Sequence, residues 1–421
     1  MENYIKKNIN SIISIFILIG PILDFLTGIC IHTLNINLTI GIIVRVLFLL
    51  FICIVTIFIF KKKKLIIPYL IIGLYFILYI LGIILYKDNN NLFFEIQNLV
   101  KVFYFPIVFL SLYSIKDKVD ISNKILVKTL FKYLILILIP TALGIGYKTY
   151  EITKSGTLGF FNSANEISGI ISILTPIMFI VFNNKKNIVL SILLGIIYLV
   201  VILMMGTKTP LLSLCFTIGV YLAYLVIESI KKKHYKKITI TISILLLGVL
   251  GLILVLPRTN FYKNIKTHLD FLEVENITDV FKKKELIDHF IFSQRLTFLE
   301  KENELYKESN LYLKVFGLGY LNNGETTKMI EMDYFDIFYH HGIIGFLVYF
   351  SIIIYLLGKK IKFNKSFEGY MLRTSFLLIG LLSFFTGHII TAPAVSIIVT
   401  VIIIRIMNCD IIANRRGEKD G

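Results

Sequence analysis

Apolar stretches of about 20 residues alternate with short polar segments along almost the whole chain. This is the length that an α-helix needs to cross a bilayer. The pattern predicts membrane-spanning helices at about 11–31, 38–60, 65–86, 93–114, 129–148, 165–182, 188–204, 209–228, 238–256, 335–358, 371–387 and 391–407. The first stretch is too long for a signal peptide and lacks a small-residue cleavage site, so we expect it to be retained.

One polar segment is much longer than the others and divides the chain into three parts. We expect transmembrane helices 1–9 in residues 1–256, a large extracellular loop in 257–334, and helices 10–12 with a cytoplasmic tail in 335–421. The predicted fold class is therefore an all-α polytopic membrane protein with about twelve transmembrane helices. The large extracellular loop should carry helices of its own.

The composition and the placement of charge agree with this fold. Hydrophobic residues make up 56% of the chain and charged residues 17%, which excludes an ordinary soluble domain. One set of connecting segments carries 24 of the basic residues, and the short turns of the alternate set carry 4. Because positive charge concentrates in cytoplasmic segments, both termini should be cytoplasmic in a multi-pass protein of the cell membrane. The net charge of +17 thus reflects topology and predicts no nucleic-acid partner.

The four cysteines stand singly in or beside predicted spans, and no pair has the spacing of a metal site. No DxD-like metal motif stands out on the predicted outer face apart from the stretch EMD at Glu331 to Asp333. Cationic side chains can take the place of a metal on a phosphate group. We therefore expect no metal and no other cofactor.

Three charged residues lie within predicted spans, about 10 Å from the outer face at 1.5 Å per residue: Asp24, Arg45 and Lys101. A charge at the centre of a membrane helix costs about 2.5–3.5 kcal/mol, so such residues face a partner or a cavity. One interpretation is a structural pair of Asp24 with Arg45 or Lys101. The other is an anion-binding cavity open to the outer leaflet, to which Lys208 in the turn MMGTKTP adds a further charge.

The long segment contains a stretch, about 282–309, that predicts one amphipathic helix. Its apolar stripe consists of Ile287, Ile291, Phe298 and Leu305. The neighbours of Arg295 three and four residues away are all apolar, so no intrahelical ion pair is available to it. Arg295 should therefore either snorkel or find an anion outside its own helix. The glycine-rich stretch 315–324 is expected to form turns.

Five ionisable groups stand immediately before the apolar run that begins at Gly342, in the sequence EMDYFDIFYHHG. They form either a solvated lip at the water boundary or the rim of a reaction site. We expect the acids at 331 and 333 to line a site, with Asp336 about one turn further on. We expect His340 and His341 to cap a water boundary.

Several of these stretches resemble the bacterial O-antigen ligase and polymerase family of lipid-linked glycan transferases. GTLGFFNSANEISGIISILTP (156–176) resembles the family's glycine- and asparagine-containing entry to a middle span, and MMGTKTPLLSL (204–214) resembles its G-S-R turn. FSQRLTF (292–298) and FGLGY (316–320) resemble its large external loop with an arginine. EMDYFDIFYHHGIIGF (331–346) resembles the stretch where the family has H-N-x-x-L before G-x-x-G.

The resemblance implies transfer of a glycan from undecaprenyl pyrophosphate to an acceptor hydroxyl at the outer face of the membrane. Its partners would be this lipid-linked donor, a glycan or other hydroxyl acceptor, and membrane lipid. The departing pyrophosphate needs cations, and the hydroxyl needs a base. The cationic candidates are Arg295, Lys208, Arg45 and Lys101. Glu331 is the candidate base and Asp333 the second candidate.

Two positions depart from the family pattern. Counted back from Gly342, the family histidine falls on Glu331, and the arginine of the outer turn is replaced by Lys208. Glutamate can still accept a proton, whereas lysine keeps the charge but loses the two-pronged geometry of arginine.

Two other classes of protein fit parts of the pattern. A transporter or a flippase for lipid-linked oligosaccharides would place charges near the bilayer midplane, whereas here they cluster toward one face. A non-catalytic scaffold leaves Arg45 and Lys101 unexplained.

Overall fold

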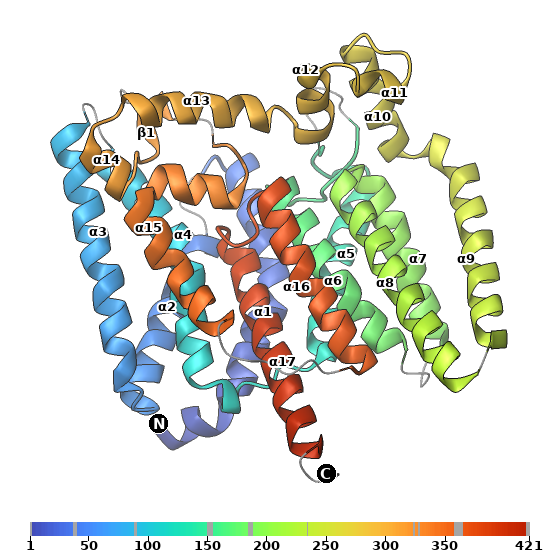
Figure 1. Ribbon diagram of the computed structural model, residues 1–421, viewed down its shortest axis with the longest axis horizontal. Helices are drawn as coiled ribbons and strands as arrows, with labels where there is room; N and C mark the ends of the chain where they lie inside the picture. Colours follow the sequence, from blue (N-terminus) through green and yellow to red (C-terminus); the bar gives the residue numbers. More distant parts are fainter. Residues whose placement is uncertain are drawn as a thin grey trace.

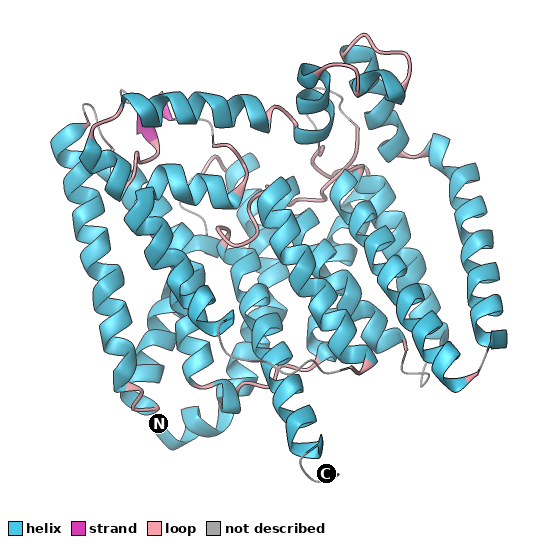
Figure 2. Ribbon diagram, in the orientation of Figure 1, coloured by secondary structure: helices cyan, strands magenta, loops and turns pink. Residues whose placement is uncertain are grey.

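The computed structural model describes residues 2–36, 40–87, 91–149, 155–183, 188–233, 235–322, 325–326, 329–357 and 365–417. The chain is an all-α polytopic membrane protein (Figure 2). In the described residues the extended elements are two short strands, β1 (Leu321–Asn322) and β2 (Glu325–Thr326), which pair antiparallel. Helices satisfy their own backbone hydrogen bonds, which is what the bilayer interior requires.

Every predicted span overlaps a helix. These helices are α1 (Glu2–His32), α2 (Ile40–Ile54) with its π-helical continuation η1 (Val55–Ile59), α3 (Ile66–Tyr86), α4 (Leu92–Ser114), α5 (Asn123–Ala142), α6 (Ala164–Phe182), α7 (Ile188–Met205), α8 (Lys208–Lys232), α9 (Tyr235–Val255), α15 (Asp333–Leu357), α16 (Phe367–Phe385) and α17 (Pro393–Gly417). Within the described residues, seven helices are long and apolar enough to cross a membrane.

The helices run between two ends of the bundle (Figure 1). Helix α1 begins and α17 ends at one of them, and the described residues of 256–332 cover the other, here called the loop end. The elements at the loop end are η5 (Leu256–Arg258), α10 (Asn260–Phe271), α11 (Ile277–Val280), α12 (Lys284–Ile287), η6 (Asp288–Phe292), α13 (Arg295–Glu308), α14 (Leu311–Phe316), β1 and β2. Beneath them α6 packs against α5, α8 and α16, and α4 packs against α17.

A buried glutamate anchors the loop end to the bundle. Glu95, in the first turn of α4, is fully buried. Its carboxylate accepts hydrogen bonds from the Tyr79 hydroxyl at 2.6 Å and from the backbone amides of Tyr320 and Leu321 at 2.8 and 3.1 Å. Because buried charge must be matched by donors, these contacts fix the β1 region onto α3 and α4.

The structure differs from the predicted elements in three places. Helix α5 spans Asn123–Ala142 rather than 129–148, because Pro140 lies in its last turn and Gly144 follows at φ +72°. The predicted helix over 282–309 is divided into α12, the π-helical η6 and α13, with a turn at Ser293 and Gln294.

The third difference is a sharp bend in α15, at Gly342 (Figure 1). Gly342 has φ +67° and ψ −176°, a conformation open to glycine. A Cβ at this position would lie 2.6 Å from the Val315 carbonyl oxygen, so α14 packs directly against the bend. Residues 333–341 therefore form a separate helical segment at the loop end.

Candidate functional site

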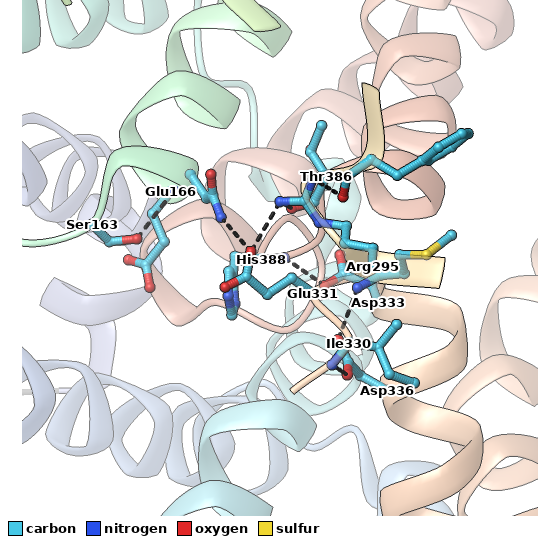
Figure 3. A network of polar contacts seen from close by, with 12 residues as sticks. Ser163, Glu166, Arg295, Ile330, Glu331, Asp333, Asp336, Thr386 and His388 are labelled. Carbon is cyan, nitrogen blue, oxygen red and sulfur yellow. Dashed lines mark hydrogen bonds and ion pairs between the residues drawn. The ribbon is translucent and has the colours of Figure 1, made fainter. Parts of the chain in front are cut away.

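An arginine and a glutamate at the loop end form a partly exposed ion pair (Figure 3). Arg295 Nη2 lies 2.9 Å from Glu331 Oε2. The arginine side chain is 9% exposed and the glutamate side chain 35%. Asn165 Nδ2, at the start of α6, donates to the same carboxylate oxygen at 3.1 Å. Arg295 thus finds its anion outside its own helix, one of the two outcomes expected from the sequence.

The position of Arg295 is set by a cap on the helix that it begins. The Asp288 carboxylate accepts from the backbone amides of Leu296 and Thr297 at 2.9 and 3.0 Å, and from the Thr297 hydroxyl at 2.7 Å. These bonds satisfy amides that the first turn of α13 leaves without partners. Negative charge also suits a helix N-terminus. Arg295 is held at this first turn.

Glu331 is held from both sides of its backbone. The Asp336 carboxylate accepts from the amides of Ile330 and Met332 at 2.9 and 3.0 Å. Glu331 itself has φ +60°, and Gly387 packs so closely that a Cβ there would lie 2.5 Å from the Glu331 carbonyl carbon. Asp336, expected near the site rim, therefore positions the residue that carries the exposed carboxylate.

Asp333, the second candidate base, has its carboxylate fully occupied. It is completely buried and accepts from the backbone amides of residues 388–390 at 2.7, 2.9 and 2.9 Å, and from the Thr391 hydroxyl at 2.7 Å. Such a carboxylate stabilises the turn between α16 and α17. This arrangement gives Asp333 a positioning role and leaves Glu331 as the exposed acid of the pair.

Strained backbone is concentrated around this ion pair. Within the described residues, eight non-glycine residues have positive φ, and four of them are Ser293, Gln294, Glu331 and His388. Each such conformation costs about 1–3 kcal/mol and persists where the surroundings enforce it, commonly at functional sites. Here the Asp288 cap, the Asp336 bonds and the Asp333 bonds enforce it.

Lys208 and Arg295 both donate hydrogen bonds to the π-helical element η6. Lys208 Nζ donates to the carbonyl of Phe290 and lies 4.0 Å from the centre of its ring. Arg295 Nη1 donates to the carbonyl of Phe292, two residues further along η6, at 3.3 Å. Burial, the positive charge of Lys208 and His289 together lower the pKa of the nearby His268. Lys208 and Arg295 therefore both contact η6, at carbonyls two residues apart.

Lys101 lies in a small pocket with Asp336 and His388. In the described chain its ammonium group forms no ion pair. The pocket adjoins Glu331, because Met329 and His388 in its wall are close neighbours of Glu331 and Gly387. Lys101 thus belongs to the same part of the molecule, on elements other than η6.

Arg45 lies elsewhere, in the interior of the bundle. It forms a buried ion pair with Asp24, and Tyr133 donates to the other oxygen of that carboxylate. The pocket at this point is lined mainly by apolar side chains of α1 and α17. The structure therefore agrees with the first interpretation from the sequence, in which Asp24 and Arg45 form a structural ion pair.

The expectation that the two histidines cap a water boundary is wrong, because both are completely buried. His340 Nδ1 lies 2.8 Å from the Gly319 carbonyl oxygen, and His341 contacts the hydroxyls of Tyr75 and Tyr320 at 3.2 and 2.8 Å. The bend at Gly342 turns their helical segment inward, beneath the loop end.

Two residues at the site were not identified from the sequence. Asn165 follows Ser163, whose hydroxyl caps α6 by accepting from the Glu166 amide at 3.3 Å. Polar residues at the start of a predicted helix could have identified Asn165 from the sequence. His388 lies in the three-residue gap between two predicted spans, in TGHII. The Asp333 carboxylate, 55 residues earlier in the chain, accepts from the His388 amide at 2.7 Å. Among the described residues, no group of three or more His, Cys, Asp or Glu side chains is arranged to hold a metal.

Comparison with known protein families gives one match. A family model described as "O-antigen ligase like membrane protein" matches residues 6–286 and 278–411. No curated protein and no solved structure matches the chain significantly.

Proposed function

The chain belongs to the family of O-antigen ligase-like membrane proteins, and we propose that it transfers a glycan from undecaprenyl pyrophosphate to an acceptor hydroxyl. The reaction would take place at the loop end, on the outer face of the cytoplasmic membrane. The acceptor is either a further lipid-linked repeat, which makes the protein a polymerase, or another molecule, which makes it a ligase.

The observation that carries this proposal is the Arg295–Glu331 pair. The hydroxyl oxygen of the acceptor attacks the anomeric carbon of the donor sugar, and the bond from this carbon to the pyrophosphate oxygen breaks. The hydroxyl proton passes to Glu331, which acts as general base. The pyrophosphate departs with the bonding electron pair and one more negative charge.

The pair links the two charge changes of this reaction. Before transfer, the Glu331 carboxylate neutralises Arg295. After Glu331 takes the proton, the guanidinium loses its anion just as the pyrophosphate gains charge. Arg295 Nε is buried and has no hydrogen-bond partner among the described residues, so the present contacts leave one donor of the guanidinium unused.

Lys208 is the second proposed ligand of the pyrophosphate. Lys208 and Arg295 donate to carbonyls of the same π-helical element, η6, and the position of Lys208 matches the turn where the family has arginine. A lysine offers a point charge rather than a two-pronged contact. Arg45 is already neutralised by Asp24, so we assign it no contact with the donor.

The direct test uses purified protein in lipid bilayers with a synthetic undecaprenyl-pyrophosphate-linked oligosaccharide. We expect a new glycosidic bond and release of undecaprenyl pyrophosphate. A ladder of longer lipid-linked products indicates a polymerase, and transfer to an added acceptor indicates a ligase. Movement of the intact donor across the bilayer without any bond formation overturns the proposal in favour of a flippase.

The outer-face location has its own test. In a variant with the four cysteines replaced by serine, Glu308→Cys at the loop end should react with an impermeant thiol reagent in intact cells. Lys118→Cys, exposed at the opposite end, should react only after permeabilisation. The reverse pattern places the site on the cytoplasmic face and contradicts the proposed topology.

A further inference from the structure

Three carboxylates stand at positions 331, 333 and 336 of the loop end, and the donors around them differ. Glu331 pairs with Arg295, and Asp333 accepts four hydrogen bonds. Asp336 is buried and accepts from two backbone amides, those on either side of Glu331. Because a buried charge must be matched by donors or by a counter-ion, Asp336 needs a further partner.

The neighbouring histidine does not supply the missing charge. His340 Nε2 lies 3.7 Å from Asp336 Oδ1, which is longer than a hydrogen bond. His340 Nδ1 lies 2.8 Å from the Gly319 carbonyl oxygen, which can only accept, so the ring proton is on Nδ1. The Nε2 atom has no hydrogen-bond partner among the described residues. The neutral ring therefore faces Asp336 with a lone pair rather than with a donor.

The ammonium group of Lys101 faces Asp336 across a small pocket. The pocket measures about 10 Å³, which is room for about one water molecule. No direct ion pair joins Lys101 to Asp336 in the described part of the chain. A single water can bridge polar groups that are too far apart for a direct bond. The polar residues around the pocket are Asn98, Lys101, Tyr320, Asp336, His388 and Thr391.

The state of Asp336 affects the proposed base through the backbone. Asp336 holds the amides on both sides of Glu331, which has φ +60°. Such a conformation costs about 1–3 kcal/mol and persists where the surroundings enforce it. Without a counter-ion, a buried carboxylate favours its neutral, protonated form, which accepts hydrogen bonds less strongly. Loss of the cation should therefore loosen the turn that presents the Glu331 carboxylate.

We propose that one water molecule in this pocket bridges the Lys101 ammonium group and the Asp336 carboxylate, and that Lys101 is thereby a positioning residue for Glu331. The inference rests on the proposed transferase function, in which Glu331 is the base. It assigns Lys101, on α4, to the turn that carries the base and not to the donor pyrophosphate. A partner in the pocket also explains why a charge is retained within α4.

The first measurement is the rate of glycan transfer by purified protein in lipid. Lys101→Met removes the charge and keeps most of the side-chain length. We expect kcat to fall about tenfold, the scale of one charge-assisted hydrogen bond, and the KM for the lipid-linked donor to stay unchanged. Lys101→Arg should keep most of the rate, because the longer guanidinium can take the place of the water. Lys132→Met, at another half-buried lysine in α5, is the matched control and should transfer like the parent.

Asp336→Asn tests the connection between the two residues. An asparagine accepts from one of the two amides and turns its own NH₂ group toward the other, so this variant should transfer slowly and melt at a lower temperature. If Lys101 acts through Asp336, the double variant Lys101→Met, Asp336→Asn should match Asp336→Asn alone in rate and in melting temperature. Additive effects overturn the proposal, as does a higher donor KM in Lys101→Met or a Lys101→Arg variant as slow as Lys101→Met.

The melting temperatures separate this proposal from the transferase function, because they require no activity. Lys101→Met should melt below the parent, and its effect should disappear in the Asp336→Asn background. Such non-additive melting in a protein that forms no glycosidic bond supports the Lys101–Asp336 link and refutes the transferase function. Additive melting in a protein that transfers glycan supports the function and refutes the link.

Discussion

Two of the arginine–carboxylate pairs in the molecule, Arg45–Asp24 and Arg295–Glu331, have the same chemistry but different surroundings. Arg45 and Asp24 lie inside the bundle, with side chains 10% and 11% exposed. Arg295 and Glu331 lie at the loop end, and the glutamate is 35% exposed. The inner pair is closed to solvent, whereas the outer pair presents a carboxylate to it.

The surroundings of the two pairs also differ in their hydrogen bonding and in their backbone conformation. Tyr133 completes the inner pair, which lies on regular helices. The outer pair includes a guanidinium nitrogen without a hydrogen-bond partner in the described chain and a glutamate at φ +60°. The comparison teaches that the chemistry of a pair does not identify its role. Exposure and enforced strain support the proposal that the outer pair is reactive and the inner pair structural.

Breaking the inner pair should give the largest effect, on stability. Arg45→Met leaves the Asp24 carboxylate buried without a cation, which costs about 3–5 kcal/mol. We expect a clear fall in the temperature at which the protein in detergent loses its monodisperse peak in size-exclusion chromatography.

The double variant Arg45→Met, Asp24→Leu sharpens this comparison. Removing both charges leaves no buried ion, and apolar replacement of a buried pair is often neutral or stabilising. We expect the double variant to recover most of the lost stability. If it remains as unstable as the single variant, the inner pair has a role beyond neutralising its own charges.

Substitutions in the outer pair should lower the rate of transfer rather than the stability of the protein. Glu331→Gln keeps the shape and the contact with Asn165 but removes the base, so transfer should slow by about 10²-fold or more. The measurement is the rate of glycan transfer by purified protein in lipid. Replacing both Arg295 and Glu331 with apolar residues should not restore the rate, in contrast to the double replacement at the inner pair, which should restore stability.

Asp333→Asn serves as the comparison for this variant. Because its carboxylate accepts four hydrogen bonds, we expect a lower melting temperature together with reduced transfer. If Glu331→Gln transfers as fast as the parent, Glu331 is not the base. The role of base then belongs to Asp333 if Asp333→Asn loses transfer without a lower melting temperature.

The spans were predictable because apolar length and the bias of positive charge are local properties of the chain. The bend at Gly342 was not, because an apolar run hides it and the packing of residue 315 against residue 342 enforces it. The division of 282–309 at Ser293 depends on the Asp288 cap, which competes with helix continuation.

The site residues were predictable individually, but their partners were not. The lack of an intrahelical acid for Arg295 was visible in the sequence, and its partner is 36 residues away. Lys101 was recognisable by its depth in a span. The His388 amide is held by Asp333, 55 residues earlier, and the preceding Gly387 packs on Glu331. Such pairings depend on tertiary structure, and the sequence offers several alternatives for each of them.

The smallest effect should come from a third carboxylate, Glu302, on the same helix as Arg295. Its residue is 4% exposed, and burial raises its pKa from 4.5 to about 7, with the positive charge of Lys87 opposing the shift. Because the folded state holds the proton more tightly than the unfolded state, stability should fall as pH rises from about 4.5 to about 7 and then level off.

Glu302→Gln removes this ionisation while keeping the shape of the side chain. At pH 8 the variant should melt about 1–3 °C above the parent, and the decline in stability between pH 4.5 and 7 should become shallower. Glu300→Gln, two residues away and exposed on α13, is the matched control and should leave this slope unchanged. The melting temperature, measured across this pH range, tests whether α13 packs onto the bundle through a Glu302 carboxyl group that holds its proton more tightly in the folded state. An unchanged slope in Glu302→Gln would mean that other groups cause the pH dependence, and that α13 is held by Asp288 and the apolar contacts alone.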